Sequence, residues 1–125
     1  MNDLPAKIAT YWAANAGSLP ALWLEYAPAS DDPPVATYRP MDFIPEFTNA
    51  GILFHTHRYK FAMLDTDAVA AYENGFTAMT LLSSFTCPGL INVKSQPEDF
   101  ATPVETGQAN VWSFEFTVDF MITPS

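Results

Sequence analysis

The residues with the clearest chemical potential are two histidines, His55 and His57, in the segment ILFHTHRYKFAM. Residues two apart on an extended strand lie on the same face, so the two imidazoles can be presented to one metal ion. No acidic residue stands in a motif relation to them that would supply a third ligand. The sequence therefore favours a solvent-facing or interface pair, and a metal site is the alternative.

The single cysteine, Cys87, has no partner for an intrachain disulfide and belongs to no CxxC motif or Cys/His motif. With one of the histidines it would form a minimal nucleophilic dyad, but no nucleophile elbow or orienting third residue accompanies it. A buried or half-buried thiol in a reduced, intracellular setting is the prediction.

Acidic residues cluster at Asp31-Asp32, Asp65/Asp67 and Glu98-Asp99. None of these clusters has the alternating ligands and central glycine of a calcium-binding loop. Motifs for phosphate binding, zinc peptidases and serine hydrolases are also missing from the sequence. We therefore predict no catalytic residues, no cofactor and no enzymatic activity.

The composition is that of one acidic domain, residues 1–125. The chain is 49% apolar and 14% aromatic, only 15% of its residues are charged, and the formal net charge is −9. Specific nucleic-acid binding is not expected, because few cations are present to replace the counterions of phosphates. A signal peptide and a membrane span are not expected either, so the protein should be soluble and made in the cytoplasm. The polar-poor surface suggests that other subunits cover part of it.

A strand followed by a helix positions the candidate residues. From Ile52 to Met63 the side chains alternate between two faces, as on a strand. Asp65 and Asp67 then offer N-capping side chains to a helix that ends near Phe85. This helix is expected to pack back on the sheet, and its apolar stripe consists of Val69, Tyr72, Phe76, Met79 and Leu82.

The remaining elements are predicted from hydrophobic periodicity and from the glycine and proline residues that end them. A first helix is predicted from Leu4 to Ala16, because apolar residues recur at helical spacing and Gly17 can end it. Strands are predicted at Ala21–Tyr26 and Leu90–Lys94, and Val35–Arg39 is at most a short edge strand among prolines. The final strand is the clearest, with one face formed by Trp112, Phe114, Phe116, Val118, Phe120 and Ile122.

Two segments are predicted to be long connections. Met41–Gly51 contains Pro45 and has no clean period, so it is read as a loop with exposed aromatic residues. Ser95–Asn110 is read as a long polar loop or loose hairpin, a length that is usually functional. The predicted fold is therefore α+β, with a mixed or mostly antiparallel sheet of about four to five strands packed by two helices in the order α-β-β-β-α-β-β, and with long connecting loops.

This order resembles the tail-terminator or tail-completion (neck) family of tailed bacteriophages. The segments YKFAMLDTDAVAAYENGFTAMTLL and VWSFEFTVDFMI carry the resemblance, which extends over most of the chain from Leu4 to Thr123. The ALWLEYAPASDDPPVATYRP region and the Met41–Gly51 loop depart from the family pattern, and so leave open a neighbouring neck or connector component.

The resemblance implies a virion structural protein of the tail or neck. Its expected form is a homo-oligomer, a hexameric ring that caps the tail tube and joins it to the head connector or head-closure protein. DNA would pass through the acidic ring without specific binding, because like charges repel. The residues expected at interfaces or in the channel are Phe43, Phe47, His55, His57, Glu98, Asp99, Phe100 and Glu105.

Two other functions are compatible with the sequence. The chain could be another phage component, from the neck, the head closure or the tail tube, because the same small folds serve several roles. A protein of a different class, a small ligand- or metal-binding α+β enzyme domain, would use His55 and His57 with nearby aromatic residues. Stoichiometric metal that is lost when both histidines are changed would favour the ligand- or metal-binding enzyme domain.

Overall fold

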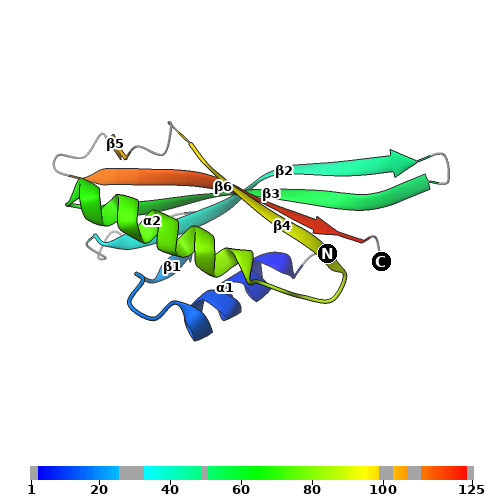
Figure 1. Cartoon of the computed structure of the whole chain (residues 1–125), viewed down its shortest axis with the longest axis horizontal. Helices are drawn as coiled ribbons and strands as arrows, with labels where there is room; N and C mark the ends of the chain where they lie inside the picture. Colours follow the sequence, from blue (N-terminus) through cyan, green and yellow to red (C-terminus); the bar gives the residue numbers. More distant parts are fainter. Residues whose placement is uncertain (1–2, 26–32, 49–50, 99–102, 107–110, 124–125) are drawn as a thin grey trace.

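A twisted mixed sheet carries both helices on one face in the computed structural model, which describes residues 3–25, 33–48, 51–98, 103–106 and 111–123 (Figure 1). The helices are α1 (Leu4–Asn15) and α2 (Ala68–Ser83). The strands are β1 (Leu22–Leu24), β2 (Val35–Thr48), β3 (Gly51–Asp65), β4 (Leu90–Pro97), β5 (Val104–Glu105) and β6 (Trp112–Ile122). The predicted α+β class and element order are confirmed, with the two-residue β5 as an addition.

The sheet has the strand order β1-β2-β3-β6-β4, and β5 pairs with β6 beside this path. Among the strands that the structure describes, β1 and β2 pair in parallel and the other pairs are antiparallel. The sheet is therefore mixed and mostly antiparallel, as predicted. No helix among the described residues is long and apolar enough to cross a bilayer.

The core lies between the helices and the aromatic face of the sheet. The alternation in β6 is confirmed, because Phe114, Phe116 and Phe120 are fully buried. Phe61 of β3 stacks on Phe116 with ring centroids 5.2 Å apart. Helix α1, which packs on this face of the sheet, contributes Leu4, Ile8 and Trp12 to the same core. Burial of these apolar surfaces is the main force that holds the helices on the sheet.

Helix α2 begins as predicted, since Asp67 is its N-cap and the Asp67 side chain accepts a hydrogen bond from the backbone N–H of Val69. Its buried residues are Ala71, Gly75, Ala78 and Leu82. Of the apolar stripe read from the sequence, only Leu82 is buried, whereas Val69, Tyr72 and Phe76 are exposed. The physical reason is that the Phe114 ring lies directly against the helix at Gly75 and leaves no space there for a larger side chain, while Tyr72 and Phe76 contact the same ring and stay partly exposed.

The predictions for the β2 region were wrong. Val35–Arg39 was expected to be at most a short edge strand and Met41–Gly51 a loop, but β2 is a 14-residue strand that lies between β1 and β3. The pairing with β1 ends at Tyr38, and no described strand pairs with the outer edge of the rest of β2, where Pro40 and Pro45 are tolerated. Irregularities in the β2–β3 register also break the alternation that would have revealed the strand.

The predicted loop Ser95–Asn110 was also partly wrong. Strand β4 continues to Pro97, and β5 forms at Val104–Glu105. The residues of β4 after Lys94 are polar because one side of this strand belongs to the uncovered face of the sheet, and β6 supplies the hydrogen-bond partners that hold them in a strand. Residues 99–102 and 107–110 lie outside the described part of the chain.

Candidate functional site

The sheet face opposite the helices, which we call the open face, gathers four of the five lysines and arginines of the chain. Strand register places Arg39 beside Lys60, and Arg58 and Lys94 on either side of Asp119. Arg39, Arg58 and Lys60 alternate with aromatic residues of the helix-bearing face along their strands, and Lys94 pairs with Asp119, so all four side chains leave the sheet on the other side. The open face is thus a surface of an acidic protein on which cations are frequent.

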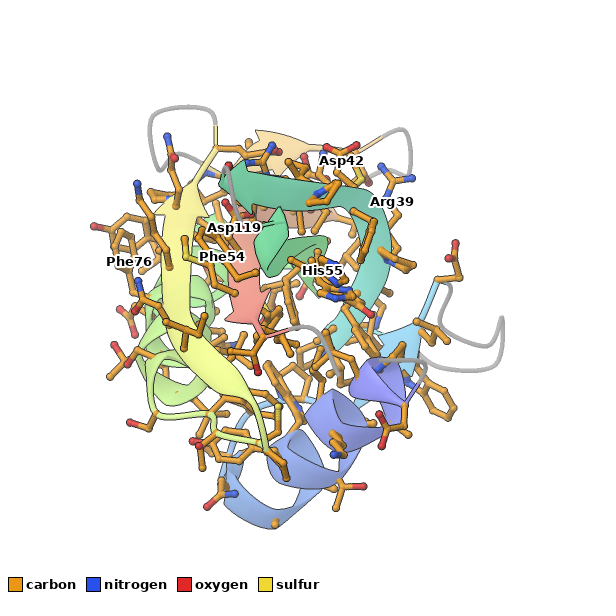
Figure 2. All side chains as sticks on the ribbon, turned by 90° about the vertical axis from the view of Figure 1, so that its right-hand side faces the viewer. Arg39, Asp42, Phe54, His55, Phe76 and Asp119 are labelled. Carbon is orange, nitrogen blue, oxygen red and sulfur yellow. The ribbon has the colours of Figure 1, made fainter. Side chains whose placement is uncertain are left out.

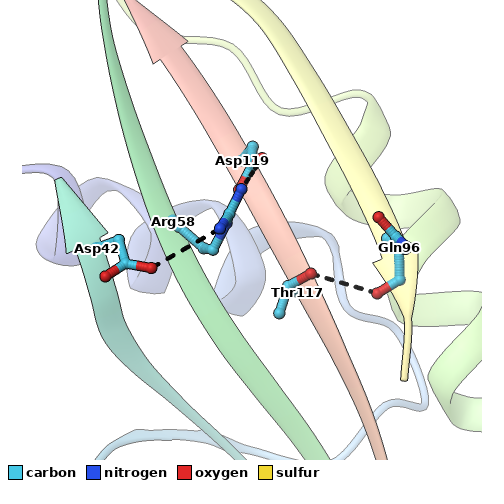
Figure 3. A network of polar contacts seen from close by, with 5 residues as sticks. All are labelled: Asp42, Arg58, Gln96, Thr117 and Asp119. Carbon is cyan, nitrogen blue, oxygen red and sulfur yellow. Dashed lines mark hydrogen bonds and ion pairs between the residues drawn. The ribbon is translucent and has the colours of Figure 1, made fainter. Parts of the chain in front are cut away.

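Arg58 is the centre of a network that joins three strands of the open face (Figure 3). Its guanidinium donates to both carboxylate oxygens of Asp119, with N···O distances of 2.8 and 3.1 Å. On the other side it lies 3.7 Å from a carboxylate oxygen of Asp42. The hydrogen bond to Asp119 and the negative charge of that residue raise the pKa of Arg58. The paired guanidinium ties β2, β3 and β6 together in a fixed register.

Lys60 forms a second network on the same face. Its ammonium nitrogen lies 3.1 Å from Glu98 of the segment after β4 and 3.6 Å from Glu115 of β6. Burial acts to lower the pKa of Lys60, but the hydrogen bond to Glu98 and the charges of Glu115 and Glu98 outweigh it, so the pKa is raised. Glu98, predicted to be an interface or channel residue, therefore lies on the open face as the partner of a lysine.

A hollow of about 440 Å³ lies on this face over the paired strands β2, β3, β6 and β4. Its charged lining consists of two cations and three carboxylates, which are Arg58, Lys94, Asp42, Glu98 and Asp119. Arg39 and Lys94 are exposed and form no ion pair among the residues that the structure describes. These two side chains are the available positive charges of the open face.

The second feature is the far half of the β2–β3 hairpin, which we call the arm (residues 41–48 of β2 and 51–57 of β3). It projects beyond the helices, and its outer part, residues 46–48 and 51–54, extends past the end of β6 (Figure 1); Figure 2 shows the molecule from this end. The pairing of β6 with β3 reaches only His55, and that of β1 with β2 ends at Tyr38. An isolated two-stranded hairpin is marginally stable in water, so a contact partner would stabilise this part of the chain.

Phe43, His55 and His57 form an aromatic cluster on the arm. The Phe43 ring centroid lies 4.6 Å from that of His55 and 5.0 Å from that of His57. Burial lowers the pKa of His57, and charge on His55 lowers it further. The His57 Nε2 atom is buried and has no hydrogen-bond partner within the described residues. The structure thus brings together three of the predicted interface residues.

A metal site receives no third ligand here. Among the described residues, no group of three or more His, Cys, Asp or Glu side chains is placed to hold a metal ion. The ring centroids of His55 and His57 are 6.3 Å apart, and both rings pack on Phe43 instead. The aromatic contacts give this histidine pair a packing role.

The other predicted interface residues are dispersed. Phe47 lies near the tip of the arm and Glu105 in β5, and the structure describes only their backbone. Asp99 and Phe100 lie outside the described residues. Cys87, expected to be a buried or half-buried thiol, is free and half-buried, and burial raises the pKa of its thiol.

The exposed side of α2 is a surface that the sequence interpretation missed. Val69, Tyr72 and Phe76 are 62%, 43% and 38% exposed, and Glu73, which follows Tyr72 in the sequence, is exposed as well. Tyr72 and Phe76 contact each other with ring centroids 4.9 Å apart. The small-residue spacing of Ala71, Gly75 and Ala78 was the signal in the sequence that the large residues point outward.

Comparisons with known proteins give no family. No protein-family model matches the chain, and no curated protein sequence matches it.

Proposed function

We propose that this protein is a virion structural protein, the tail-terminator or tail-completion subunit of a tailed bacteriophage. In this role it forms a homo-oligomeric ring, expected to be a hexamer, that caps the tail tube and joins it to the head connector. It acts through surfaces and has no enzymatic activity. The observation that carries the proposal is the arm, a projecting hairpin with exposed apolar side chains.

The arm favours an assembly role because it is costly to leave it in water. Phe43 and Met41 are 55% and 45% exposed at its base. At this base β3 is still paired with β6 and Phe43 packs on His55 and His57, but more than half of the Phe43 side chain stays exposed. Exposed large apolar side chains are typical of a contact with another protein. In a closed ring every subunit offers its arm to a neighbour, so all the arms are covered.

The distribution of charge supports the second part of the proposal, the passage of DNA. The formal charge of the chain is −9. Arg58 and Lys60, the two central cations of the open face, are already paired with carboxylates. Few positive charges are therefore free to hold phosphates, and a ring of such subunits repels a duplex that moves through it.

Electron microscopy tests the proposal. Purified protein, alone or mixed with tail-tube protein, should give rings, and Phe43→Asp should reduce their number strongly. Leu24→Asp is the matched control, because Leu24 is 48% exposed but lies on β1 away from the arm. A monodisperse monomer that binds neither tube nor connector protein would refute the proposed function.

The choice between a tail terminator, a head-closure protein and a tail-tube protein depends on which virion proteins bind this chain. A terminator binds both the tail tube and the head connector, whereas a head-closure protein binds the connector side and a tube protein polymerises with itself. Pull-down with each purified neighbour distinguishes the three. Binding to the connector alone would indicate a head-closure protein of the neck in place of a tail terminator.

A further inference from the structure

The Nε2 atom of His57 is an unsatisfied polar atom at the base of the arm. It is shielded from solvent, and no group among the described residues forms a hydrogen bond with it. A neutral imidazole can place its acceptor nitrogen at such a position. An imidazolium carries two N–H donors and a positive charge, and a buried cation without a partner is far more costly. The surroundings of His57 therefore accept the neutral ring and disfavour the charged one.

The described groups that face His57 supply no negative charge to compensate for its protonation. On the helix-bearing side of the sheet these groups are Phe43 of β2, Phe120 of β6, and His55 and Tyr59 of β3. Burial raises the pKa of Tyr59 to about 12, so its phenol is neutral near pH 7. Burial lowers the pKa of His57, and the positive charges of the chain's amino terminus and of His55 lower it further. The acids of the adjoining strands lie on the open face, and they are Asp42, Glu46 and Asp119.

Strand β2 is the side of this cluster that can move. Phe120 is fully buried in β6, which is paired with β3 on one side and with β4 on the other. Phe43 packs edge-on against His57 but is 55% exposed, and no described strand pairs with the outer edge of β2 there. The register irregularity between Pro40 and Asp42 interrupts the β2–β3 ladder just before Phe43. Displacement of Phe43 is therefore the least costly way to bring water to His57.

We propose that His57 is a pH-sensitive switch of the arm, whose protonation displaces Phe43 and opens the base of the arm while the rest of the sheet stays paired. At neutral pH the imidazole is uncharged, Phe43 packs on it and the arm is closed. In mild acid the open form is favoured, because water reaches the imidazolium and the two histidine side chains can move apart. The switch belongs to the single chain and needs no ring, so its failure would leave the proposed function standing.

Hydrogen exchange of the full chain, followed by mass spectrometry, tests the switch. One proton links the two forms, so the opening constant should rise by up to about tenfold for each pH unit below about 6.5, until the pKa of the closed form is passed. Between pH 7.5 and 5.5 the amides of residues 41–48 should lose protection, after correction for the intrinsic exchange rate, while those of β6 keep it. Aspartates and glutamates with ordinary pKa values stay ionised over this range.

Two variants assign the effect to His57. His57→Phe keeps an aromatic ring and removes the titration, so the protection of its arm should not depend on pH. His55→Gln is the matched control, because it removes the only other histidine of the chain and leaves the switch in place. In this control the loss of protection should begin at a higher pH, since one charge that opposes the protonation of His57 is gone.

Proton NMR of the wild type follows the two histidine rings directly and does not depend on the folding of any variant. His57 should titrate below pH 6.5, and its contact with the Phe43 ring should vanish as it does so. A His57 that titrates at or above pH 6.5, or an arm whose protection does not change with pH, overturns the switch. Equal loss of protection in His57→Phe and the wild type overturns it too. So does a parallel loss in β6, because acid would then unfold the whole sheet.

Discussion

Replacement of Gly75 by alanine tests the close packing of α2 on the sheet. Gly75 is buried in the middle of the helix, directly over Phe114 of β6. A Cβ atom at this position would lie 2.5 and 2.7 Å from Cε1 and Cγ of the Phe114 ring, and closer still to Cδ1. Such contacts are far inside van der Waals distance, so either the ring or the helix must move.

The expected magnitude is a balance of two effects. Alanine in place of glycine inside a helix gains about 1 kcal/mol of helix propensity. Overpacking of a well-filled core costs about 1–3 kcal/mol, because Phe114 lies among other buried rings and has little room to turn. The cost of overpacking should exceed the gain in helix propensity, so we expect Gly75→Ala to lower the free energy of unfolding by up to about 2 kcal/mol. For a domain of this size, each kcal/mol corresponds to about 3–5 °C in Tm.

Denaturant unfolding of a double-mutant cycle isolates this effect. In a Phe114→Leu background the shorter side chain can move aside, and Gly75→Ala should there be neutral or stabilising, which gives a coupling of about 1–3 kcal/mol. The difference between Thr77→Ala and Thr77→Gly, on an exposed position of the same helix, measures the gain of alanine over glycine in helix propensity without a new contact. If Gly75→Ala stabilises the wild type as much as it stabilises the Phe114→Leu variant, the helix does not pack as closely as the structure indicates.

Three further predictions follow from the arm, the open face and the thiol. Because the fold lowers the pKa of His57, the unfolded chain binds more protons, so stability is complete above about pH 6.5 and falls as the pH drops below that value. Thermal unfolding at pH 7.5 and 5.5 should show a smaller loss for His57→Gln than for the wild type. Arg58→Lys should cost about 0.5–1 kcal/mol in urea unfolding, since it loses the bidentate contact of a partly exposed pair, whereas Arg39→Lys should cost nothing measurable. Burial raises the pKa of Cys87, so iodoacetamide should alkylate the native protein more slowly than the urea-unfolded protein, and equal rates would contradict the burial.

The sequence alone determined the elements whose pattern is local. The alternation in β3 and β6, the N-cap Asp67 and the helical spacing of α1 all depend on residues a few positions apart, and the structure confirms them. From these elements the α+β class and the helix-bearing face of the sheet follow. Periodicity is reliable here because each of these segments has one face in the core and one outside it.

The tertiary structure decided what depends on distant neighbours. Pro40 and Pro45 are compatible with β2 only because β1 is too short to reach them, and no local pattern contains that fact. Helix α2 carries two apolar stripes, one of large residues and one that includes Ala71, Gly75 and Ala78. The second stripe is buried, because the ring of Phe114 lies against the helix at Gly75. Arg58 meets Asp119 across 61 positions of sequence. The arm, the open face and the outer side of α2 are surfaces made by packing, so sequence periodicity could name some of their residues but could not bring them together.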